Sequence, residues 1–138
     1  MDLKKLERFI DRQGVAFICS VDDKNFPNVK AMLKPRKHIG LSEFYFSTNT
    51  SSMRVQQYLA NPKACIYFYR KGIIHYEGLM LKGTMEVLTD QASKNMIWKC
   101  GDKMFYKGGV TDPDYCVLKF TAVGGRYYRD LKTESFDI

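Results

Sequence analysis

The sequence predicts a mainly β protein: a small β-barrel of six to seven mostly antiparallel strands, with short flanking helices. Short apolar or alternating segments typical of strands outnumber segments with helical spacing, and turn residues separate them. No strand–helix–strand alternation with a Gly-rich phosphate fingerprint occurs, which disfavours a doubly wound fold. With 138 residues, the chain is expected to form a single domain over residues 1–138.

In the first half of the chain, apolar spacing predicts a helix over residues 2–12, which Gly14 ends. Strands are expected over 15–21 and 27–33, joined by a turn at 22–25, and a third strand over 44–47. A second helix is expected over 52–60, and Asn61-Pro62 ends it.

In the second half, strands are expected over 64–69 and 76–88. Asp90 can cap a short helix over 91–100 that includes Trp98. A loop spans 101–114, and segments 115–121 and 126–131 are expected to form a hairpin that turns at Gly124-Gly125.

Composition excludes several classes of protein. The separations of Cys19, Cys65, Cys100 and Cys116 form no Cys-x-x-Cys pair and indicate no zinc site, so free thiols in a cytoplasmic protein are expected. The only histidines have no metal-ligand spacing, and we expect no bound metal. The charged N-terminus does not resemble a signal peptide, and no stretch approaches the ~18 apolar residues of a membrane span.

The basic surplus is confined to one part of the sequence. Lys and Arg number 22 against 15 Asp and Glu, a net charge of +7. Residues 30–72 hold eight basic residues and the single acid Glu43, so this span alone carries 8 − 1 = +7. A local surplus indicates a site for an anionic partner rather than a generally basic surface.

The segment from Phe44 to Arg54 is the most informative. It reads as a strand, then a run of small polar residues, then the start of a helix whose first turn contains Arg54. A cation there opposes the helix dipole, whereas an anion bound by the backbone N–H groups, the hydroxyls and Arg54 would be stabilised. The alternative is a capped helix whose Arg54 points into water. Lys30 and Lys34 share one strand face, either at the same site or in solvent.

Several motifs together resemble the pyridoxamine 5′-phosphate oxidase superfamily, in particular its short branch similar to general stress proteins. They are Pro27-x-x-Lys30-x-Met32, Phe44-Tyr45-Phe46-Ser47-Thr48-Asn49, Ser52-Met53-Arg54 and Asn61-Pro62. The resemblance covers nearly the whole chain and implies an FMN-binding split β-barrel that forms a homodimer with the cofactor at the subunit interface. It makes the residues around Lys30 candidates to line the flavin and the Ser/Thr/Arg segment a candidate phosphate site. The implied cofactor-binding residues are Lys30, Ala31, Met32, Leu33, Phe46, Ser47, Thr48, Ser52, Met53, Arg54 and, from the partner's long strand, Glu77 and Gly78.

The resemblance implies an FMN-binding protein that either transfers hydride or electrons from a nicotinamide donor to an unidentified small-molecule acceptor, as an oxidoreductase, or binds flavin without fast turnover; FAD stays an alternative cofactor. The oxidase proper has an Arg-x-His element near its C-terminus, which is absent after Arg126-Tyr127-Tyr128-Arg129, and Thr121 stands where oxidases place an aromatic residue. Oxidation of pyridoxine phosphate is therefore not expected, and the catalytic residues are unknown. A nucleic-acid-binding barrel is the alternative, because Tyr67, Tyr69, Arg70 and Lys71 interleave aromatic and basic side chains. A related split barrel that binds haem, a deazaflavin or no cofactor is a third possibility.

Overall fold

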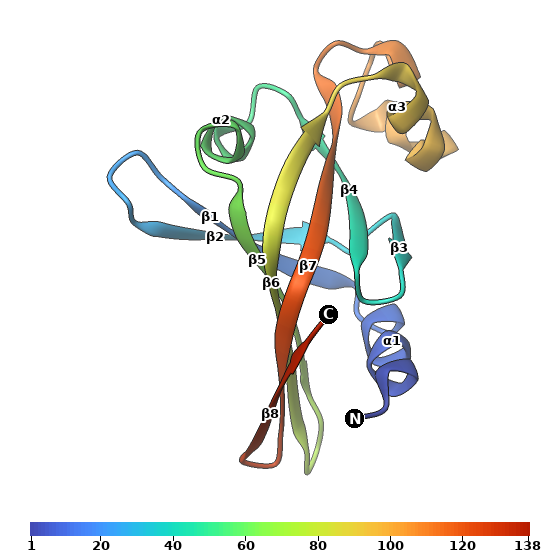
Figure 1. The fold of residues 1–138 in the computed structure, drawn as a ribbon. Helices are drawn as coiled ribbons and strands as arrows, with labels where there is room; N and C mark the ends of the chain where they lie inside the picture. Colours follow the sequence, from blue (N-terminus) through green and yellow to red (C-terminus); the bar gives the residue numbers. More distant parts are fainter.

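An eight-stranded antiparallel sheet curls into a barrel that does not close (Figure 1). The computed structural model describes residues 1–138. The strand order is β2-β1-β5-β6-β7-β4-β3, and β8 pairs with β7. The mainly β, split-barrel prediction is confirmed. The strands are β1 (Val15–Val21), β2 (Pro27–Leu33), β3 (Lys37–Ile39), β4 (Glu43–Asn49), β5 (Lys63–Lys71), β6 (Tyr76–Leu88), β7 (Tyr115–Arg129) and β8 (Lys132–Asp137).

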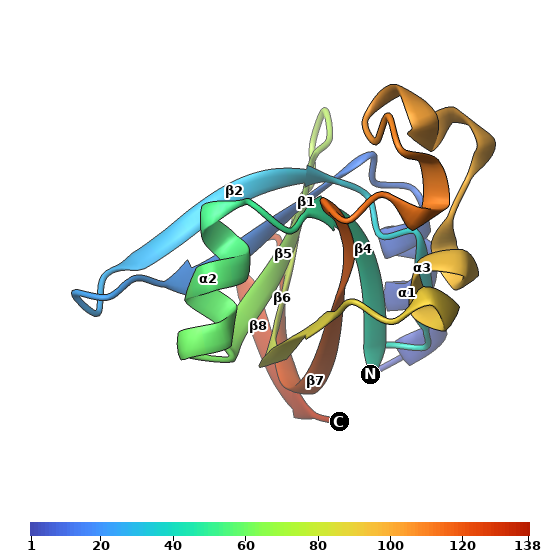
Figure 2. The same ribbon diagram turned by 90° about the horizontal axis from the view of Figure 1, so that it is seen from above.

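Short helical segments flank the sheet (Figure 2). They are α1 (Leu3–Asp11), α2 (Met53–Ala60), α3 (Gln91–Ile97) and two 3₁₀ turns, η1 (Cys100–Met104) and η2 (Gly109–Thr111). Asp2 caps α1 by accepting a hydrogen bond from the Lys5 backbone N–H. The buried face of α1 packs Leu6, Phe9 and Ile10 into the barrel core, as their helical spacing predicts. No helix is long and apolar enough to cross a membrane.

The core lies inside the curled sheet, because strand residues alternate between its two faces. On β1, Ala16 and Ile18 point into the core, while Phe17 and Cys19 are half-buried on the opposite, outer face. A second, smaller cluster packs around Tyr115 beneath α3. This cluster attaches the α3–η2 region to the outside of the β4–β7 pair.

The turn predicted at Gly124-Gly125 is wrong. β7 runs unbroken through both glycines to Arg129, and the hairpin turns at Asp130-Leu131, where both residues have positive φ. The glycines serve close packing instead: a Cβ on Gly125 would come within 2.7 Å of the Phe136 ring and 2.8 Å of a Leu81 methyl group. The prediction missed β8 for this reason, and it also missed the short strand β3.

Gly83 marks the irregular point in the β6–β7 pairing, where the register shifts between Lys82 and Gly83. A Cβ on Gly83 would overlap the carbonyl oxygen of Thr121 on the neighbouring strand. The backbones of β6 and β7 therefore approach closely only because position 83 has no side chain.

We expect Gly83→Ala to lower the free energy of unfolding by about 2–3 kcal/mol, because backbone atoms of β7 cannot move aside cheaply. Gly14→Ala is the matched control, since a Cβ there meets nothing within 4 Å. Urea unfolding followed by circular dichroism measures both. Equal midpoints for the two variants would show that the close approach at Gly83 does not matter.

Candidate functional site

A pocket of about 210 Å³ lies where the barrel stays open, between β2 and β4. Ala31, Met32 and Leu33 line it from β2, and residues 46–49 line it from β4. Arg54, in the first turn of α2, lines it as well. The two strand segments that line this pocket, 31–33 and 46–49, are thus about fifteen residues apart in sequence, and the curl of the sheet brings them together.

The walls of this pocket are strand edges. β2 is the end strand of the sheet and pairs only with β1. On its side away from β7, β4 pairs with β3 only through residues 43–45, so residues 46–49 have no strand neighbour there. Backbone N–H and C=O groups at such edges need another hydrogen-bonding partner. The pocket therefore offers backbone donors and acceptors as well as apolar side chains.

The start of α2 carries polar atoms without partners. Ser52 is the N-cap residue, but its side chain makes no capping hydrogen bond. The hydroxyl oxygens of Ser47 and Ser52 and the Nε atom of Arg54 are buried and have no hydrogen-bond partner. Buried polar groups are nearly always paired, so three orphans within eight residues call for a ligand. No acidic residue lies in the first turn, and the helix dipole favours a negative charge there. These residues fit an anion such as a phosphate group.

Asp114 holds the loop that precedes α2. Its carboxylate accepts hydrogen bonds from the Ser51 backbone N–H at 2.9 Å and from the Asn49 side-chain amide at 3.0 Å. These hydrogen bonds, first that of Ser51, lower the pKa of Asp114. The sequence indicated only a turn at Asp112-Pro113-Asp114. The structure shows that this turn fixes the polar loop across 65 residues of sequence.

A buried ion pair supports the part of the pocket lining that comes from the segment after α3, at Phe105 and Tyr106. Arg36 donates to Asp102 of η1, and their side chains are only 15% and 3% exposed. Asp102 also accepts the Lys99 backbone N–H at 2.8 Å. The chain that follows places Phe105 and Tyr106 in the pocket lining.

Aromatic packing anchors the same wall. The Tyr106 ring lies 4.8 Å from that of Tyr115 and 6.2 Å from that of Trp98, measured between centroids. Trp98 lies just after α3 ends, not within it. From the sequence, Trp98 is expected in a helix, Phe105 and Tyr106 lie in the loop over 101–114, and Arg36 is one of the eight basic residues of 30–72. None of them is a candidate site residue there, because no local pattern connects residue 105 with residue 36.

The structure brings together only part of the candidate set. The candidates that line the pocket are Ala31, Met32, Leu33, Phe46, Ser47, Thr48 and Arg54. Ser52 lies outside the lining but supplies one of the orphaned hydroxyls. Lys30 is exposed and does not line the pocket, whereas Lys34, just beyond the end of β2, does. The two lysines therefore do not occupy equivalent places, because β2 ends at Leu33.

Glu77 and Gly78 lie on β6, away from the pocket lining. Glu77 is buried and accepts hydrogen bonds from Arg70 and from the Tyr127 hydroxyl. Burial acts to raise the pKa of Glu77, but these hydrogen bonds and the charges of Arg70 and Arg129 outweigh it and lower the pKa. Arg70 is thereby paired with a carboxylate. This pairing reduces the free positive charge beside Tyr69, which the alternative of a nucleic-acid-binding surface requires.

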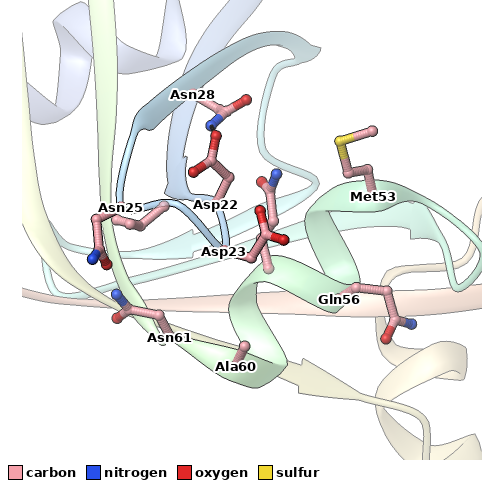
Figure 3. A pocket seen from close by; sticks show the side chains of 10 residues that line it. Asp22, Asp23, Asn25, Asn28, Met53, Gln56, Ala60 and Asn61 are labelled. Carbon is pink, nitrogen blue, oxygen red and sulfur yellow. Dashed lines mark hydrogen bonds between the residues drawn. The ribbon is translucent and has the colours of Figure 1, made fainter.

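A larger cleft of about 670 Å³ lies between the β1–β2 turn and α2, and Met53 lines it (Figure 3). Its polar lining consists of amides and the carboxylates of Asp22 and Asp23, with no basic residue. Asp22 is engaged within the turn, accepting the Lys24 and Phe26 backbone N–H groups at 2.9 Å. Two carboxylates without a basic side chain nearby would repel a phosphate in this cleft. The smaller pocket, which Arg54 lines, is therefore the better candidate for an anion site.

Asp102→Asn is expected to lower the free energy of unfolding by about 2–3 kcal/mol, because it leaves the buried Arg36 without a counter-charge. Asp11→Asn is the control: Asp11 also pairs, with His38, but its side chain is 63% exposed, and a loss below about 1 kcal/mol is expected. Adding Arg36→Gln to Asp102→Asn should restore part of the loss. Urea unfolding measures all three variants. Equal losses for Asp102→Asn and Asp11→Asn would show that the ion pair does not hold the wall.

Comparison with known proteins identifies a matching family model and solved structures of similar fold. The family model described as pyridoxamine 5′-phosphate oxidase matches residues 3–129. A Clostridium acetobutylicum protein related to general stress protein 26 of Bacillus subtilis, from the pyridoxinephosphate oxidase family, is 40% identical. The alignment covers 99% of this chain and 94% of that one, with a TM-score of 0.87.

Two more distant structures share the fold. General stress protein 26 from Bacillus anthracis is 19% identical, with a TM-score of 0.80 over 99% of this chain and 98% of that one. A pyridoxamine 5′-phosphate oxidase-related, FMN-binding protein from Nostoc punctiforme is 14% identical, with a TM-score of 0.71 over 98% and 95% of the two chains. No curated protein sequence matches the chain.

Proposed function

Because the chain belongs to the pyridoxamine 5′-phosphate oxidase family, we propose that it binds FMN in the pocket between β2 and β4 and acts as an oxidoreductase. The observation that carries the proposal is the group of unpartnered buried atoms of Ser47, Ser52 and Arg54. The FMN-binding description of the Nostoc protein, which has the same fold, supports it.

The phosphate of FMN suits the start of α2. It is a dianion, and charge-assisted hydrogen bonds to such a group are short and strong. Two hydroxyls and a guanidinium N–H at or just before the start of this helix are buried without partners, and no carboxylate is in the first turn. The phosphate monoester of FMN can carry two negative charges, whereas the corresponding phosphate of FAD is part of a diphosphate bridge and carries one. We therefore favour FMN over FAD.

The flavin ring suits the rest of the pocket. Met32, Leu33 and Phe46 supply apolar contact, and the open edges of β2 and β4 supply backbone groups for the polar edge of the ring. When bound, FMN supplies the capacity to transfer hydride or electrons; this chain orients the ring and limits its contact with water. We propose a nicotinamide donor and a small-molecule acceptor other than pyridoxine phosphate, and a cytoplasmic location, where thiols such as those of the four free cysteines stay reduced.

We also propose a homodimer that completes the site. At about 210 Å³ the pocket is below the ~300 Å³ at which pockets for drug-sized ligands begin, so one chain provides only part of a flavin site. The outer face of β2, β1 and β5 exposes apolar side chains, among them Val15, Val29, Leu33 and Tyr69. An exposed apolar sheet face of this kind marks an interaction surface, and a second copy is the occupant we propose.

Purified protein is expected to be yellow and to bind added FMN. Ser52→Ala combined with Arg54→Ala should weaken FMN binding at least about 100-fold, since each removes a donor to a charged group. Quenching of flavin fluorescence measures the dissociation constant. Riboflavin, which has no phosphate, should bind weakly to the wild type and no more weakly to the double variant.

Lys63→Ala and Lys71→Ala are the controls, because both residues belong to the basic span but do not line the pocket. They should leave FMN affinity within about threefold of the wild type. A colourless protein that takes up no FMN would rule the proposal out. Salt-dependent binding of oligonucleotides by such a protein would favour the nucleic-acid alternative.

Val29→Asp should convert the dimer to monomers, because it places a charge on the apolar face of β2, β1 and β5. Leu59→Asp is the matched control: Leu59 is 64% exposed and Val29 is 68% exposed, but Leu59 lies on α2, away from this face. Sedimentation velocity measures both masses. The Val29→Asp variant should also bind FMN less tightly. A monomeric wild type that nevertheless binds FMN would refute the dimer while leaving the cofactor proposal intact.

A further inference from the structure

Cys19 and Cys65 lie directly opposite each other on β1 and β5. Their neighbours Ile18 and Ile66, also opposite each other, point into the core, so both cysteines project from the outer face of the sheet. Both are half-buried and free. Directly opposed residues of antiparallel strands have Cβ atoms about 4.5–5.5 Å apart. A disulfide needs about 3.5–4.5 Å, which a small movement of the strands provides.

The two thiols also differ in reactivity. A hydrogen bond from Cys65 lowers the pKa of Cys19 to about 7 against the opposing effect of burial, while the same contact and burial raise the pKa of Cys65. The nearest titratable groups are Tyr58 of α2, whose hydroxyl donates to the Cys19 carbonyl oxygen, and Lys82, which lies opposite Cys65 on β6. The charge of Arg54 acts on Tyr58. Cys19 is thus the member of the pair whose pKa is lowered, and we assign it the first attack on an oxidant.

We propose that Cys19 and Cys65 are a reversible oxidation site that closes to an intrachain disulfide when the protein meets hydrogen peroxide. The Cys19 thiolate attacks one peroxide oxygen, the O–O bond breaks, and hydroxide leaves and takes a proton to become water. The Cys65 sulfur then attacks the Cys19 sulfenic acid, and the S–S bond forms as a second water leaves. Two thiols and one peroxide give one disulfide and two waters, and a reducing dithiol reverses the change.

The position of the pair gives the bond a structural consequence. β1 and β5 pair over only Phe17–Cys19 and Cys65–Tyr67, whereas β5 and β6 pair over nine residues. This short ladder joins the β1–β2 hairpin, which carries the pocket residues Ala31–Leu33, to the rest of the sheet. A disulfide there would fasten that hairpin to β5. It restrains the unfolded chain between residues 19 and 65 as well.

The other two cysteines provide internal controls. Cys100 is exposed in η1, and Cys116 is buried on β7 opposite Thr48, so neither faces another cysteine. The inference does not rest on FMN binding. The pair lies on the face that we assign to the dimer, so the oxidant, hydrogen peroxide, and the reductant, dithiothreitol, are both small molecules.

The test treats the full-length protein with hydrogen peroxide, blocks remaining thiols with an alkylating agent and maps the peptides by mass spectrometry. We expect one product, a Cys19–Cys65 disulfide, in the wild type and in the Cys100→Ser/Cys116→Ser variant. Its rate of formation should rise as the pH increases through about 7. The oxidised protein should melt roughly 5–10 °C higher, and dithiothreitol should reverse this.

Cys19→Ser and Cys65→Ser should each abolish the disulfide and the rise in melting temperature. The proposal is overturned if Cys19 stops at sulfinic acid while Cys65 stays alkylatable, or if the disulfide joins two chains on a non-reducing gel. It is equally overturned if peroxide leaves both thiols free in the native protein. None of these outcomes bears on FMN affinity, which is measured separately on the reduced protein.

Discussion

The open edges of the sheet are the constraint on which the candidate site depends. A closed barrel pairs all its strand edges, but here β2 and part of β4 end the pairing and face each other across a gap. Backbone groups on such edges must meet water, another strand or a ligand. The pocket lies in this gap and α2 begins beside it, so Ser47 and Arg54 line the pocket, while the unpartnered hydroxyl of Ser52 lies at the adjoining start of the helix.

Ion pairing then decides which basic residues remain available to a ligand. Arg36 is paired with Asp102, and Arg70 with Glu77, so both serve to fix structure. Arg54 has a buried Nε atom without a partner and lines the pocket. The net charge of +7 therefore indicates less about binding than the pairing does, because the charge of a paired guanidinium is already partly balanced by its carboxylate partner.

The outer face of β2, β1 and β5 combines two roles that the structure suggests independently. Its exposed apolar residues suit a second copy of the chain, and its opposed cysteines suit oxidation. Both features depend on the short β1–β5 ladder, which sets the position of the β1–β2 hairpin. A disulfide that stiffens this ladder and a partner that covers it would act on the same pocket wall at Ala31–Leu33.

The segments 31–33 and 46–48, which line the pocket, were candidate site residues only through the resemblance to the family. Local pattern determined most strands and the start of α2 at Ser52, because alternation and capping are set by neighbouring residues. It did not determine where β7 turns, since Gly124-Gly125 serves packing against Phe136 rather than a turn. Local pattern also did not predict that Arg36 and Phe105 line the pocket or that Lys30 lies outside the lining. The Arg36–Asp102 pair spans 66 residues of sequence, and such contacts arise only once the sheet has curled and brought distant strands together.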